Sequence, residues 1–158
     1  KAMKKLAIIL GMAAIIALPT LAQAREVTFT TQLQNYGGDG AYLALYLVDA
    51  NGTYQRTLWV AGKKAKYYKH LPDWARGSGL RSSEYDGVTG ASVLSGKALD
   101  VTLDIPDALI DAGYEVRVDT AVEDMRDNRA DASAPLTSDG VGKSFPGRGY
   151  VKSLSYSF

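Results

Sequence analysis

The sequence predicts an all-β fold, an antiparallel β-sandwich of the immunoglobulin or fibronectin kind with little helix. Three observations predict it. Apolar and polar residues alternate with a period of two along several segments, an Asn-Gly pair separates two of these segments, and helical periodicity is slight. Short strands joined by turns at such intervals are typical of two packed sheets.

The strands expected in the first half of the chain begin with residues 27–34, where apolar residues alternate with threonine and glutamine. Residues 41–48 are apolar at both sets of alternating positions, which predicts a central strand covered on both faces. Asn51-Gly52 is a strong hairpin signal, so residues 54–60 are expected to return as the partner strand.

The second half of the chain contains three more alternating segments, at residues 99–105, 114–122 and 150–158. Helix is expected only as a turn or two, within residues 66–76, where Pro72 would interrupt it, and within 107–112. The residues predicted to face the core share the period of two and are Phe29, Leu33, Leu45, Leu103, Val116 and Val118.

Two long loops are predicted, over residues 75–96 and 124–148, because both stretches are rich in glycine, serine and aspartate. Residues 123–131 mix acidic residues with arginine and lack the spacing of a calcium-binding loop. We interpret this stretch as an exposed loop that pairs its own charges.

The N-terminal segment has the three parts of a secretory signal peptide. Basic residues within positions 1–5 precede an apolar run over residues 6–18, and residues 22–24 form an Ala-x-Ala cleavage site. The run is shorter than the roughly 20 residues that span a bilayer. We therefore expect residues 1–24 to be removed, and residues 25–158 to act outside the cytoplasm as a single β-sandwich domain that is not embedded in the membrane.

Charge and composition narrow the classes of function. Removing Lys1, Lys4 and Lys5 reduces 18 basic residues to 15 against 17 acidic ones, so the net charge changes from +1 to −2. This balance predicts neither nucleic acid nor an anionic membrane as a partner. The absence of cysteine excludes disulfides and cysteine-ligated metal centres, and a single histidine, His70, argues against a histidine-based metal site or catalytic triad. No catalytic residue and no metal site is predicted.

A short motif lies in the first long loop. Residues 86–92, Asp-Gly-Val-Thr-Gly-Ala-Ser, are similar to the acidic-x-x-Ser/Thr-Gly-Ala-Ser/Thr motif at which an extracytoplasmic flavin transferase joins FMN to a hydroxyl group through a phosphoester. The resemblance makes Ser92 the acceptor, because its hydroxyl supplies the ester oxygen.

The same resemblance assigns recognition by the transferase to Asp86, Thr89, Gly90 and Ala91. Gly90 and Ala91 are small, so the flavin donor and the transferase can approach the backbone closely. Asp86 is expected to help position the metal–diphosphate centre of the transferase. The alternative interpretation is a surface loop whose serine and threonine make local turn hydrogen bonds.

A wider resemblance covers most of the chain after the signal peptide. It is carried by residues 41–49 (AYLALYLVD), 56–59 (RTLW), 71–74 (LPDW), 86–92 (DGVTGAS) and 112–118 (AGYEVRV). In these segments the chain resembles the bacterial periplasmic family DUF2271, a domain of unknown function, which implies a periplasmic location. Members of this family often occur with PepSY-type membrane proteins and flavin transferases, which implies extracytoplasmic electron transfer, often linked to reduction or uptake of iron or other metals.

The sequence departs from the family in several places. Many members have arginine at the position of Gly90, threonine at that of Ser92, and Pro-x-Gly where this chain has residues 94–96, Leu-Ser-Gly. Gly90 brings the chain nearer to the flavin-attachment motif, and Ser92 keeps a hydroxyl. Residues 123–126, Glu-Asp-Met-Arg, replace an acidic-His-Gly stretch, so no role of that histidine transfers.

Two functions follow as hypotheses. The first is a periplasmic electron-transfer protein that carries covalent FMN on Ser92 and works with a PepSY-type membrane reductase, as a redox carrier rather than a stand-alone enzyme. The alternative is a cofactor-free periplasmic binding or accessory module. Trp59, Tyr67, Tyr68 and Trp74 are candidates for stacking on a flavin ring, although aromatic residues of a sandwich more often belong to its core.

Overall fold

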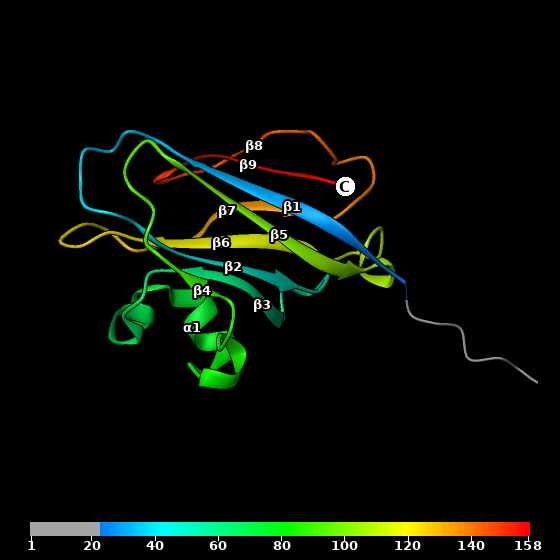
Figure 1. The fold of residues 1–158 in the computed structure, drawn as a ribbon, viewed down its shortest axis with the longest axis horizontal. Helices are drawn as coiled ribbons and strands as arrows, with labels where there is room; N and C mark the ends of the chain where they lie inside the picture. Colours follow the sequence, from blue (N-terminus) through cyan, green and yellow to red (C-terminus); the bar gives the residue numbers. More distant parts are fainter. Residues whose placement is uncertain (1–22) are drawn as a thin grey trace, which may run out of the picture.

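The computed structural model describes residues 23–158, which form two β-sheets packed face to face (Figure 1). One sheet has the strand order β5-β1-β9-β8 and the other β4-β3-β2-β6-β7. The predicted β-sandwich is therefore confirmed. The strands are β1 (Ala24–Leu33), β2 (Tyr42–Val48), β3 (Tyr54–Ala61), β4 (Thr89–Gly90), β5 (Ala98–Pro106), β6 (Glu115–Ala121), β7 (Asn128–Pro135), β8 (Phe145–Pro146) and β9 (Val151–Ser157).

Strand pairing within residues 23–158 is antiparallel except between β3 and β4, which run parallel. The five-stranded sheet is thus mixed, which differs from the purely antiparallel arrangement expected. The hairpin predicted at Asn51-Gly52 joins β2 to β3, and Gly52 takes the positive φ of 77° that the turn requires. The signal peptide is predicted for residues 1–24, and residues 1–22 of it lie outside the described part of the chain. The first strand, β1, begins at Ala24.

The core lies between the two sheets and follows the period-two pattern of the strands. Alternate side chains of β1, β2 and β6 point into it, and the bulky apolar ones exclude water from both inner faces. Of the predicted core residues, Leu103 is only partly buried and packs against the core edge. The others are fully buried: Phe29, Leu33, Leu45, Val116 and Val118.

A second apolar layer covers the outer face of the five-stranded sheet. It is supplied by the 3₁₀-helix η1 (Ala65–His70) and the helix α1 (Pro72–Ser78), which Figure 1 shows on the side of this sheet away from the other sheet. Tyr68 and Trp74 pack there against Tyr46 on β2. The prediction that the second strand is covered on both faces is confirmed.

Pro72 begins α1 instead of interrupting a helix, which corrects the expectation for residues 66–76. Proline is accommodated at the first helical position because the amide it lacks would have no intrahelical partner there. Gly79 follows the helix in the left-handed conformation, with φ of 63°, and ends it. Two further 3₁₀ turns occur, η2 (Ser82–Glu84) and η3 (Asp107–Leu109), the second within the stretch where a turn was expected.

The interpretation of residues 123–131 as an exposed loop is wrong from residue 128 onward. Residues 128–135 form β7, an edge strand whose three alanines and one serine give no strong alternation of large apolar side chains. Asp131 is fully buried and accepts hydrogen bonds from the backbone amides of Arg148 (2.9 Å), Gly149 (2.7 Å) and Tyr150 (2.8 Å). The predicted charge pairing within the stretch is replaced by bonds to a distant turn.

Candidate functional site

The flavin-attachment-like motif is held at the edge of the five-stranded sheet. Val60 on β3 donates a backbone hydrogen bond to the carbonyl of Val88 (2.9 Å), and Gly62 donates one to the carbonyl of Gly90 (2.8 Å). Val93, directly after the motif, exchanges two backbone hydrogen bonds with Ala41 (2.7 and 3.0 Å). The predicted loop over residues 75–96 thus contains a short strand that fixes the backbone around the motif.

Gly90 is required by packing against Trp59. A Cβ atom at Gly90 would lie 2.7 Å from Cζ2 of the Trp59 indole, closer than real side chains approach. The absence of a side chain at this position is therefore explained by the fold, whether or not a transferase reads the motif.

The Ser92 side chain lies on the outer face of the sheet. Ala41 and Val93 are both buried in the core, so the residues that flank their bridge have their side-chain positions on the opposite face. The position that a Cβ atom would occupy at Gly40 is 2.8 Å from Ser92 Oγ, as this geometry requires. Ser92 is exposed, and its hydroxyl makes no hydrogen bond within residues 23–158.

The remaining motif residues are also accessible. Asp86, Thr89 and Ala91 are exposed, and Gly87 has a positive φ of 83° that favours glycine. In the described part of the chain neither Thr89 nor Ser92 uses its hydroxyl in a local turn hydrogen bond.

Two hollows lie near Ser92, which lines the smaller one and lies against Gly40 at the border of the larger one. The smaller has a volume of about 340 Å³, and Ser92 lines it together with Trp59, Leu94, Lys97 and Leu99. The larger, of about 490 Å³, lies beyond Gly40 and is bounded by Tyr42, Tyr67 and the chain that follows β6. Both volumes are within the range of small-molecule sites.

The two hollows differ in charge. The larger is bordered by the carboxylates of Asp39, Glu123, Asp124 and Asp127, and His70 Nδ1 lies 3.0 Å from Asp127 Oδ2. Of the described residues that line the smaller hollow, Lys97 alone is charged. An anionic group beside Ser92 is therefore stabilised on one side of this residue and repelled on the other.

Aromatic and sulfur-containing side chains line the larger hollow. The rings of Tyr42 and Tyr67 meet edge to face, with centroids 5.8 Å apart, and Met125 is 42% exposed beside them. Of the four aromatic residues proposed to stack on a flavin, Trp59 and Tyr67 line hollows. Tyr68 and Trp74 are buried under the sheet as core residues.

Hydrogen bonds connect the loop that follows Ser92 to the loop that precedes Ala41. Ser95 Oγ donates to Asn35 Oδ1 and accepts from the backbone amide of Gly37, both at 3.2 Å. Gly96 donates its amide to the carbonyl of Gln34 (3.0 Å). Ser92 is thus presented by a loop anchored on both sides.

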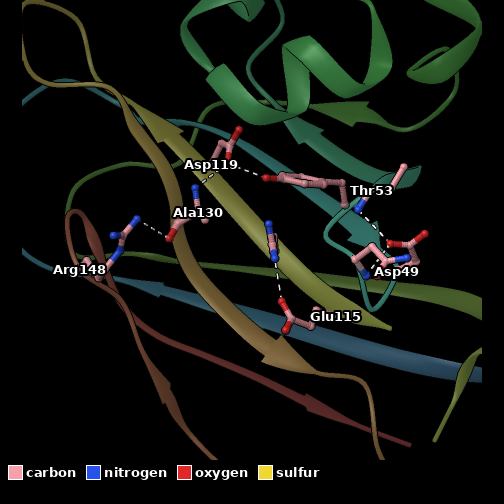
Figure 2. A network of polar contacts seen from close by, with 9 residues as sticks. Asp49, Thr53, Glu115, Asp119, Ala130 and Arg148 are labelled. Atoms are coloured by element: carbon pink, nitrogen blue, oxygen red, sulfur yellow. Dashed lines mark hydrogen bonds and ion pairs between the residues drawn. The ribbon is translucent and has the colours of Figure 1, made fainter. Parts of the chain in front are cut away.

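Sequence reasoning missed a buried carboxylate, Asp119, on β6. It is fully buried below α1 and accepts hydrogen bonds from Tyr46 Oη (2.9 Å), the Trp74 amide (2.8 Å) and the Ala130 amide (2.8 Å). Figure 2 shows Asp119 below the helix and connected to Ala130. Burial raises the pKa of Asp119, while these three donors act in the opposite direction. The neighbouring Tyr46 has its pKa raised, first by burial and then by Asp119.

Within residues 23–158, histidine, aspartate and glutamate nowhere gather in a group of three suited to a metal ion. No helix in the same range is long and apolar enough to cross a membrane.

The fold and the site define a small β-sandwich protein with an accessible hydroxyl between two hollows. The model of the family described as predicted periplasmic protein (DUF2271) matches residues 24–153. The chain belongs to this family, which confirms the resemblance drawn from the sequence and the periplasmic location. No curated protein and no solved structure matches the chain.

Proposed function

We propose that this protein is a periplasmic electron-transfer protein that carries FMN bound covalently to Ser92. The observation that carries the proposal is that Ser92 is exposed, that its hydroxyl makes no hydrogen bond in the described chain, and that the residue lines the smaller hollow. It stands at the acceptor position of a motif similar to the flavin-attachment sequence. Its partners are a flavin transferase and a PepSY-type membrane reductase, and metal or iron reduction or uptake is the process it serves.

The attachment is a phosphoryl transfer from a flavin–adenine dinucleotide donor. Ser92 Oγ attacks the phosphorus that bears the riboflavin part, the diphosphate bond to AMP breaks, and the hydroxyl proton is released. The product is a phosphodiester between Ser92 and riboflavin, with AMP as the leaving group. No oxidant or reductant is consumed, and the catalytic groups belong to the transferase.

The residues around Ser92 fit the product. Lys97 borders the same hollow as Ser92, where its ammonium can stabilise the negative charge of a phosphodiester. Asp86, Thr89 and Ala91 are exposed at the sheet edge, so a transferase can reach the motif without unfolding the sheet. Bound FMN supplies the electron-transfer chemistry, and the protein supplies position and electrostatics.

Coexpression with a periplasmic flavin transferase tests the proposal. The purified protein should gain the mass of one FMN less one water, and should fluoresce yellow-green after denaturation. Ser92→Ala should abolish the gain because the acceptor oxygen is lost, and Ser92→Thr should retain it. Thr89→Ala is the matched control: it removes a nearby exposed hydroxyl and should lower labelling less.

An unlabelled wild-type protein, beside a transferase that modifies a control substrate, would overturn the proposal. Labelling that persists in Ser92→Ala would show that another residue is the acceptor. In the first case a cofactor-free binding or accessory module becomes the better description, with the two hollows as its binding surface.

A further inference from the structure

We propose that the flavin ring attached through Ser92 lies in the larger hollow, against Tyr42, Tyr67 and Met125, while its phosphodiester lies beside Lys97 in the smaller hollow. This inference rests on the proposed function. It assigns the two hollows different parts of one ligand and predicts how the protein sets the redox potential.

Charge assigns the phosphodiester to the smaller hollow. A phosphodiester is anionic at neutral pH, and the larger hollow presents the carboxylates of Asp39, Glu123, Asp124 and Asp127. The smaller hollow is lined by Lys97, its one charged residue among those described. The oxidised isoalloxazine ring is uncharged, so it can enter the acidic hollow from which the phosphate is repelled.

Shape and surface chemistry assign the ring to the larger hollow. It has the greater volume, about 490 Å³ against 340 Å³, and it offers two tyrosine rings and a methionine. Flat aromatic groups pack well on tyrosine faces and edges and on thioether sulfur. In the smaller hollow the Trp59 indole is partly covered by Gly90, which leaves less aromatic surface free.

Gly40 lies between Ser92 and the larger hollow and has no side chain to block a ligand that extends from one to the other. Ser92 Oγ is 2.8 Å from the position of a Cβ atom at Gly40, and Gly40 itself borders the hollow. In the same loop, Met125 occupies the space that a side chain at Gly38 would take: its Sδ lies 2.8 Å from the position of a Cβ atom at Gly38. A ribityl chain leaving Ser92 can therefore follow the backbone of this loop toward Met125.

The acidic residues that line the larger hollow affect the redox potential of a flavin ring placed there. Reduction adds negative charge to the flavin, and nearby carboxylates disfavour that charge. The ring is thus held at a lower potential than it would have in a neutral hollow, which makes the protein a better electron donor.

Fluorescence of the labelled protein tests the position of the ring. Tyrosine in contact with a flavin quenches its emission, so the folded wild type should emit less, with higher anisotropy, than the same protein unfolded. Tyr67→Leu should restore several-fold more emission. Tyr114→Leu, a tyrosine substitution at the opposite end of β6, should leave emission unchanged.

The midpoint potential gives a second measurement. Glu123→Gln with Asp124→Asn should raise the potential of the bound flavin, whereas Asp139→Asn, an exposed carboxylate elsewhere, should not. If the wild type carries no FMN by mass, the proposed function and this inference fail together. If FMN is present but Trp59→Phe changes its emission and Tyr67→Leu does not, the ring lies in the smaller hollow and only this inference fails.

Discussion

The carboxylate of Asp119 accepts a hydrogen bond from the backbone amide of Trp74 at 2.8 Å. Trp74 is the third residue of α1, and Leu71 before the helix has no side-chain group to cap it. Asp119, on β6, therefore supplies from the sheet the acceptor that a capping side chain gives elsewhere. The same carboxylate binds Tyr46 on β2 and Ala130 on β7, so one buried group connects the helix to three strands.

Replacing Asp119 with asparagine should destabilise the fold. The amide keeps one acceptor oxygen but places its NH2 group where the other oxygen accepted a backbone amide, from Trp74 or from Ala130. A buried donor left without an acceptor costs about 1–3 kcal/mol. We expect a loss of at least that size in the free energy of unfolding by urea. Asp104→Asn on the exposed face of β5 is the matched control and should change stability by less than about 0.5 kcal/mol.

The pH dependence of this difference has a definite sign. Burial raises the pKa of Asp119 in the folded protein, so folding favours the protonated form. The stability that this protonation preference contributes is fully present below the pKa of an unfolded aspartate, about 3.9. It is lost as the pH rises through the raised pKa of Asp119 in the folded protein. The advantage of the wild type over Asp119→Asn should therefore shrink between acidic and neutral pH. A gap that widens instead would show that the three donors outweigh burial.

The inner faces of the sandwich were predictable because burial there repeats every second residue. Phe29 and Val118 follow this period, and the turn at Asn51-Gly52 sets the hairpin. β7 was missed because its inward residues are alanines and an aspartate, which carry little hydrophobic signal. The expectation for Pro72 was wrong because proline is found both where a helix is interrupted and at the first position of a helix, and the sequence alone did not distinguish the two.

The candidate site was predictable only as a motif. Residues 86–92 identify Ser92 by themselves, but its position between two hollows depends on the Ala41–Val93 bridge, which joins segments far apart in the chain. Asp119 falls on the polar set of alternating positions within residues 114–122, so alternation alone predicts an exposed side chain there. The helical layer covers this face only through tertiary packing, which the alternation within the strand does not predict.

Asp131 should be as sensitive as Asp119. Its Oδ1 accepts the amides of Arg148 (2.9 Å) and Gly149 (2.7 Å), and its Oδ2 accepts Thr120 Oγ1 (2.7 Å) and the Tyr150 amide (2.8 Å). Asp131→Asn should cost at least about 2 kcal/mol, because buried donors lose their acceptor. Amide hydrogen exchange should rise first in residues 148–150. Asp139→Asn, at an exposed position, should leave both stability and exchange unchanged.

The contact between Gly90 and Trp59 predicts coupling between these two residues. Gly90→Ala places a Cβ atom 2.7 Å from the indole, and such overpacking costs about 1–3 kcal/mol. Trp59→Leu is itself destabilising, but in that background Gly90→Ala should cost less, giving a coupling energy of about 0.5–3 kcal/mol in a double-mutant cycle. Additive effects would mean that the indole moves aside freely and that glycine is not required by packing.

Gly40→Ala tests whether Ser92 is the acceptor by crowding it without removing it. A Cβ atom at Gly40 would lie 2.8 Å from Ser92 Oγ and 3.4 Å from Ser92 Cβ, and the φ of Gly40 is one that alanine adopts. The hydroxyl must then turn away from the outer face, so transfer of FMN by the transferase should slow several-fold while the protein remains folded.

Gly38→Ala is the matched control for this experiment. It makes the same substitution in the same loop, but its Cβ atom meets Met125 Sδ at 2.8 Å instead of Ser92. Labelling should proceed at the wild-type rate, and only the emission of the bound flavin should change, because Met125 is displaced. Rates are compared by mass spectrometry over a time course with purified transferase and donor. Equal labelling of Gly40→Ala and Gly38→Ala would contradict attachment at Ser92 through the outer face, since crowding of its oxygen would then have no effect on the reaction.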